Sequence, residues 1–299
     1  MSGNIRGLRD IDRDREERER RALIQRNREN RRPNQYPILG YGFELGTADS
    51  ARKETFCQMI KYIFCPYFTI YSFIFAITCA QIIMYTITVF YDYNTDAFLE
   101  PEEDTLDDFG AKNPEEMQQN YQVWRFVTPI LLHANMAHII FNLFTQVILG
   151  FRLEPTVGWW RTAIVYVGSG IGGVIFSCLV APDDLAVGAS TAIFGITAAM
   201  IMWIIMNWSS LEDDLYRTVT LIWLLILLMF NILLGFTSSL IDNWGHIGGT
   251  ITGLVLGFVV FELIDPPTQT DKYLKVAGYV FLGFYYIGGL VLFYTVIET

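Results

Sequence analysis

The chain alternates long apolar runs with short polar segments from about residue 60 onward. A transmembrane helix needs about 20 predominantly apolar residues. Seven runs reach or approach that length, at about residues 64–90, 129–151, 162–180, 186–208, 219–236, 244–264 and 276–297. This pattern predicts an all-α polytopic membrane protein with seven spanning helices.

Charge is concentrated in two polar segments. Residues 1–61 hold 14 Lys or Arg with 10 Asp or Glu, and residues 91–125 hold 10 acidic residues and two basic ones. The rest of the chain carries far less than the roughly one-quarter of charged residues that a soluble domain needs on its surface. We therefore exclude a cytosolic enzyme, a nucleic-acid binder and a disordered chain, and we expect the lipid bilayer as a partner.

The basic residues also predict an orientation. Lys and Arg collect on one side of the alternating spans, which the positive-inside rule assigns to the cytosol. The N-terminus is then cytosolic, and the second, fourth and sixth spans enter from the opposite side, where the acidic loop 91–125 lies. The first 32 residues mix both signs of charge, unlike a presequence or a secretory signal, so we expect a retained, disordered tail.

Three histidines, His133, His138 and His246, all fall in predicted spans. An ionisable group in a membrane is costly without a partner or a water-filled cavity, so each is a candidate functional residue, the alternative being a hydrogen bond that joins helices. His138, Asn142 and Gln146 follow each other at helical spacing, after a helix start predicted at Thr128-Pro129. Their stripe is either packing contact or a set of donors for a developing negative charge.

Small residues line one face of the fourth span, and Gly249, Gly253 and Gly257 continue the face of His246 on the sixth. Such faces allow close backbone packing in membranes. If the two faces meet, His246 lies beside Ser190, which we expect about one turn into its helix. An imidazole that accepts the serine proton makes the hydroxyl a nucleophile.

This set of residues resembles the rhomboid intramembrane serine proteases, and the resemblance covers about residues 64 to 297. The motifs that carry it are, in chain order, Trp124-Arg125, His133 with His138 and Asn142, Glu154, Gly188-Ala189-Ser190, and His246 with Gly249 and Gly253. Each motif is weak by itself, but together and in this order they are highly specific.

The resemblance implies a catalytic dyad of Ser190 as nucleophile and His246 as general base. It assigns oxyanion stabilisation to His138, Asn142 and the Ser190 backbone N–H, and stacking on the imidazole to Phe194. It implies no cofactor, and single-pass membrane proteins as substrates, cleaved in or near their transmembrane segment. We expect Trp124, Arg125 and Glu154, with Gly188, Gly249, Gly253 and His133, to be supporting residues.

The resemblance also implies a domain organisation. Residues 1–61 form the tail, residues 62–264 a six-helix catalytic core that includes the loop 91–125, and residues 265–299 a linker with a seventh helix. A seventh helix after the core is similar to the six-plus-one arrangement of eukaryotic secretory-pathway members. We therefore expect a secretory-pathway endomembrane or the plasma membrane.

The residues around the predicted dyad leave alternatives for activity and for the role of Asp242. Thr191 stands where the family pattern has glycine, and its branched side chain can crowd the helix contact or the substrate cleft. An inactive relative would bind client membrane proteins and steer their trafficking or degradation, but such relatives typically lose the Ser or the His. Asp242 can approach His246, although helix capping explains it better.

Other mechanisms need residues that the spans lack. A metalloprotease needs HExxH, and an aspartyl type needs paired membrane aspartates. The four cysteines have no CxxC pair and no neighbouring histidine, so no metal site is expected. A transporter would show internal repeats or a polar path across the bilayer.

Overall fold

The computed structural model describes residues 67–91, 99–211, 214–235 and 242–298, with a few positions between 15 and 25. Most of the predicted tail 1–61 lies outside the described residues. The helices are α3 Phe73–Tyr91, α4 Glu103–Asp108, α5 Pro114–Gln119, α6 Met136–Val157, α7 Trp159–Val180, α8 Ser190–Met206, α9 Asp214–Gly235, α10 Asn243–Val260, and a last rod of α11 Gln269–Gly283, a π-helical turn Phe284–Gly288 and α12 Gly289–Thr295.

Each predicted span corresponds to one long helix of the structure. Five of them, α3, α6, α7, α9 and the last rod, are long and apolar enough to cross a membrane, so the chain is a multi-pass membrane protein. The other two are α8, apolar but only 17 residues long, and α10, with 18 residues and several glycines. These two helices pack mainly against protein, which relaxes the requirement for length and hydropathy that lipid contact imposes.

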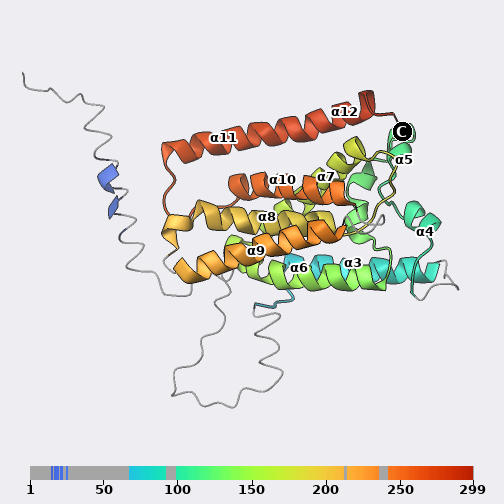
Figure 1. Ribbon diagram of the computed structural model, residues 1–299, viewed down its shortest axis with the longest axis horizontal. Helices are drawn as coiled ribbons and strands as arrows, with labels where there is room; N and C mark the ends of the chain where they lie inside the picture. The colour runs from blue at the N-terminus through green and yellow to red at the C-terminus, as the bar shows by residue number, and fades with distance from the viewer. Residues whose placement is uncertain are drawn as a thin grey trace, which may run out of the picture.

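Neighbouring helices run in alternating directions, and the loop 99–135 covers one end of the bundle. At that end Lys112 pairs with Ala186 ahead of α8, and Gln118 of α5 donates to the carbonyl of Phe293 in α12. Figure 1 shows α4 and α5 at the same end as the C-terminus. The N-termini of α6, α8 and α10 therefore lie together, as the alternation of spans predicts.

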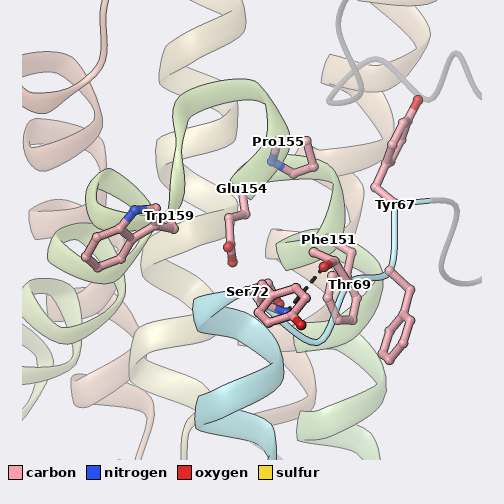
Figure 2. Close-up of a pocket in the computed structure, with 9 residues that line it drawn as sticks. Tyr67, Thr69, Ser72, Phe151, Glu154, Pro155 and Trp159 are labelled. Carbon is pink, nitrogen blue, oxygen red and sulfur yellow. Dashed lines mark hydrogen bonds between the residues drawn. The ribbon is translucent and has the colours of Figure 1, made fainter.

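The opposite end of the bundle is closed by helix capping and an ion pair. Glu154 of α6 accepts hydrogen bonds from the backbone N–H groups of Phe73 and Ile74, both at 3.0 Å, and so caps α3. Figure 2 shows its carboxylate pointing toward the α3 end in the wall of a cleft of about 400 Å³. Arg161 pairs with Glu262 across the same end. Through its two hydrogen bonds, Glu154 joins the C-terminal part of α6 to the start of α3.

The helix packing is tightest where α7, α8 and α10 meet. A Cβ built on Gly253 of α10 would overlap the Gly195 carbonyl oxygen of α8 and lie 2.5 Å from its Cα atom. A Cβ built on Gly172 of α7 would lie 2.5 Å from the Thr252 Cγ2 atom. Because these glycines have no side chain, the backbone of α10 packs directly on that of α8, and Thr252 of α10 packs directly on the backbone of α7.

The predicted start of the second span is wrong by several residues. Thr128-Pro129 opens a short 3₁₀ turn, Thr128–Leu131, and α6 begins only at Met136 with Asn135 as its cap. Thr128 is the first residue of that turn and its cap is Val127, so the predicted cap is wrong, while Pro129 lies in the first turn as predicted. His133 consequently lies in the segment before α6, outside the helix.

Candidate active site

Ser190 is the first residue of α8, where the sequence pattern predicted a position one turn into the helix. The cause is Gly188, whose φ of +130° is incompatible with a right-handed helix. Its N–H donates to the carbonyl of Pro129 at 2.9 Å, which holds the chain in that conformation. The serine hydroxyl and its backbone N–H therefore lie at a helix N-terminus, whose free N–H groups favour negative charge.

His246 lies in the first turn of α10 and contacts Ser190 directly. Its Nε2 atom is 2.8 Å from the Ser190 Oγ atom. The ring stacks on Phe194 of α8 with centroids 4.2 Å apart and planes inclined by 12°. Both rings are buried, so the imidazole is fixed in position and orientation by α8 and its hydroxyl partner.

No carboxylate completes a triad among the described residues. The Nδ1 atom of His246 has no hydrogen-bond partner there. Asp242 instead caps α10, because its carboxylate accepts a hydrogen bond from the Gly245 N–H at 2.8 Å. The capping interpretation of Asp242 is confirmed, and the geometry is that of a serine–histidine pair.

His138 and Asn142 project from α6 toward Gly188, next to the serine. A Cβ built on Gly188 would lie 2.8 Å from the His138 Nε2 atom and 3.6 Å from the Asn142 Nδ2 atom. Asn142 Nδ2 is buried without a partner among the described residues. Two polar side chains thus converge on Gly188, two residues before Ser190 at the N-terminus of α8, an arrangement that can stabilise an oxyanion.

The third member of the predicted stripe, Gln146, has a different role. It donates to the Gln81 side chain of α3 and accepts from the Tyr166 hydroxyl of α7. Gln81 in turn donates to the Tyr166 hydroxyl and to the Ile130 carbonyl at 3.1 Å. All three side chains are fully buried. The stripe therefore has two roles. His138 and Asn142 lie near Ser190, and Gln146 joins α6 to α3 and α7.

His133 supports His138 through a ring contact. The two rings meet edge to face with centroids 5.2 Å apart. His133 is fully buried, and neither ring nitrogen has a partner among the described residues. The segment before α6 thus packs one imidazole against another, which limits the motion of His138.

The small-residue faces of α8 and α10 meet as expected. A Cβ built on Gly249 would overlap the Thr191 carbonyl oxygen, and Gly253 faces Gly195 in the same way. The Thr191 side chain itself turns away from the serine. Its Cγ2 atom would lie 2.9 Å from a Cβ on Gly245 and 3.0 Å from one on Gly173, so two glycines make room for the branched side chain.

Trp124 and Arg125 lie in the loop and stand away from the Ser190–His246 pair. Arg125 is buried and pairs with Asp107 at 2.8 Å, while the same nitrogen donates to the Ala111 carbonyl at 2.7 Å. Trp124 is half-exposed, with 52% of its surface accessible. Arg125 therefore fixes the fold of the loop, and Trp124 is free to anchor it at an interface.

Sequence reasoning missed Lys112, which is fully buried beneath the same loop. Its ammonium donates to Ser177 at 2.8 Å, close to the start of α10. The available signal was a single lysine inside a strongly acidic segment. Spacing alone does not distinguish such a lysine from a solvated one.

Comparison with known proteins identifies the family. The model of the Rhomboid domain matches residues 120–263. Rhomboid-like protease 1 of Toxoplasma gondii is 33% identical over 240 residues, which cover 76% of this chain and 79% of that protein. The chain belongs to the rhomboid family. Rhomboid-like protease 2 of the same organism is 31% identical over 210 residues, covering 70% of this rhomboid and 72% of the relative.

Plant relatives match over a shorter region. RHOMBOID-like protein 6, mitochondrial, of Arabidopsis thaliana is 33% identical over 182 residues, 61% of this rhomboid. The match spans a little over half of that relative, 57% of its length.

Proposed function

We propose that the protein is an intramembrane serine endopeptidase that uses Ser190 and His246 as its catalytic dyad. The observation that carries the proposal is the 2.8 Å contact between the Ser190 Oγ and His246 Nε2 atoms at the meeting of α8 and α10. Family membership adds support, since relatives in Toxoplasma gondii are named proteases.

The reaction begins when the Ser190 hydroxyl attacks a substrate carbonyl carbon while His246 accepts its proton. The resulting oxyanion is stabilised by the Ser190 backbone N–H together with the His138 and Asn142 side chains. Protonated His246 then gives its proton to the leaving amine, and an acyl-enzyme remains on Ser190. Water releases the acyl group with His246 again acting as base.

We propose single-pass membrane proteins as substrates, cleaved in or near their transmembrane segment. The same proposal takes the N-terminus as cytosolic and the loop over Ser190 as facing the lumen or exterior. It keeps the limits 1–61, 62–264 and 265–299 for tail, catalytic core and seventh helix. For the compartment we keep the secretory pathway or plasma membrane, although one plant relative carries "mitochondrial" in its name.

The test co-expresses the full chain with a tagged single-pass reporter. Wild type should release the reporter ectodomain, and Ser190→Ala and His246→Ala should each reduce release by at least about a thousandfold, because the two residues act as one unit. Ser209→Ala is the matched control and should cleave normally, because Ser209 is exposed in the turn after α8, at the end of that helix opposite Ser190.

Cleavage that survives either dyad substitution would contradict the mechanism. Reporter that binds wild type stably without being cut would instead support the client-binding alternative. The position of the cut, determined by mass spectrometry of the released fragment, tests the assignment of the substrate class.

A further inference from the structure

Lys112 is a buried cation that the proposed mechanism does not use. It lies in the loop between α3 and α6 and is fully inaccessible to solvent. Its Nζ atom donates to the Ser177 hydroxyl at 2.8 Å and to the Ala181 carbonyl at 3.2 Å, both at the end of α7. Burying an ammonium group is costly unless hydrogen bonds and a counter-charge compensate, so these contacts need an explanation.

Ser177 connects the lysine to a carboxylate. Its hydroxyl has a single hydrogen, which it donates to Asp242 Oδ1 at 2.7 Å while its oxygen accepts from Lys112. The same Oδ1 atom accepts from the Gly245 N–H. A line of hydrogen bonds therefore runs from the Lys112 ammonium to the carboxylate of Asp242, the cap of α10, which in turn binds the N–H of Gly245, one residue before His246.

The backbone of Lys112 pairs with the segment that leads into α8. Its N–H donates to the Ala186 carbonyl at 2.8 Å, and the Ala186 N–H donates back at 3.1 Å. Ala186 lies two residues before Gly188, whose conformation starts α8 at Ser190. One residue of the loop thus pairs directly with the segment before α8 and is linked through Ser177 to the cap of α10.

We propose that Lys112 is a positioning residue that holds Ser190 and His246 in register, through its backbone to Ala186 and through Ser177 to Asp242. This inference rests on the proposed dyad. Small displacements of reacting groups reduce rates steeply even where binding is unchanged. Loss of the ammonium should therefore lower kcat and leave KM largely unaffected.

The experiment compares Lys112→Met, Ser177→Ala and their combination in the full chain. Methionine keeps an apolar stem and the backbone pairing with Ala186, and removes only the charge and its hydrogen bonds. Lys275→Met is the matched control, because Lys275 donates to the Phe261 carbonyl at 2.7 Å at the opposite end of α10. The readouts are kcat and KM on a reporter peptide and amide hydrogen exchange of residues 243–247.

Each single variant should lower kcat by about tenfold or more with KM within about twofold of wild type. The kcat of the double variant should be no lower than that of the more impaired single variant, because the two substitutions break the same line of hydrogen bonds. Amide hydrogen exchange at residues 243–247 should accelerate in both single variants. Lys275→Met should leave all of these measurements at wild-type values.

A wild-type kcat for Lys112→Met would overturn the inference, as would a loss confined to KM or an equal loss in Lys275→Met. If wild type cleaves no substrate, the proposed function fails and hydrogen exchange still decides the inference. Unchanged exchange at residues 243–247 in Lys112→Met would then reject the link between loop and helix.

Discussion

The central helices and the peripheral helices pack in different ways. In α7, 56% of the most apolar 18-residue stretch is buried within the protein, compared with 6% of the corresponding stretch in α9 and 17% in the last rod. Glycines line the central contacts, so α10 meets the backbones of both α7 and α8. A Cβ built on Gly173 would lie 2.6 Å from the Gly245 carbonyl oxygen, and one built on Gly253 would overlap the Gly195 carbonyl oxygen. Such contacts cannot adjust by rotating a side chain, and the candidate dyad is located where they are tightest.

The last rod is attached by longer and more adaptable contacts. Tyr285 and Tyr286 donate to the carbonyls of Gly172 and Gly168 in α7, both at 2.9 Å. They lie in the π-helical turn Phe284–Gly288, and Gly283 just before it has open space around its Cα atom. The comparison indicates that dyad geometry depends on the centre, while the periphery contributes mainly stability.

The largest effect is expected when the same substitution is made in both regions. Gly253→Ala should abolish cleavage and destabilise the fold by about 3 kcal/mol, because the added methyl group meets the Gly195 backbone and nothing there can move aside. Gly283→Ala should stabilise the protein by about 0.5–1 kcal/mol and leave cleavage unchanged. For both variants, thermal unfolding in detergent measures the change in stability and reporter cleavage measures the change in activity. Equal effects at the two glycines would remove the distinction between the regions.

Thr191 offers an intermediate test inside the centre. The family pattern suggests that Thr191→Gly should increase activity, but Thr191 is buried between Gly173 and Gly245. We expect the substitution to destabilise the fold by about 1–3 kcal/mol through the cavity and the flexible glycine, without raising kcat/KM. Thr86→Gly on the exposed face of α3 is the control and should cost less than about 1 kcal/mol. A higher kcat/KM in Thr191→Gly would instead mean that threonine obstructs the site.

The smallest effect is expected at the periphery. Tyr285→Phe removes one hydrogen bond to the Gly172 carbonyl and keeps the ring, so it should cost about 1 kcal/mol of stability. The kcat on a reporter should not change, because no central backbone contact is altered. Steady-state kinetics with unfolding curves check both values. A large fall in kcat would show that the last rod also controls the dyad.

Much of this architecture is readable from local patterns. Apolar runs predict the seven helices, and the glycine spacing around His246 predicts the close contact of α8 with α10. The cap at Asp242 is equally local, because its carboxylate accepts from an N–H three residues later. These features need only helical periodicity and the chemistry of one turn.

The sequence-based predictions fail where contacts between residues far apart in the sequence determine the conformation. The start of α8 depends on Gly188 at φ +130°, held by the Pro129 carbonyl. The burial of Lys112 depends on Ser177 and Ala181, more than 60 residues away. Periodicity contains no information about such partners, so an apolar run is extended too far and a buried lysine is taken for a solvated one.

The most direct test of the central claim is the site of covalent labelling by a fluorophosphonate, which reacts with activated serines. The full chain in detergent is treated with the probe, digested and analysed by mass spectrometry. The account predicts an adduct on Ser190 in wild type and Lys275→Met, and none in His246→Ala. An adduct on another serine, or wild-type labelling of Ser190 in His246→Ala, would contradict the dyad.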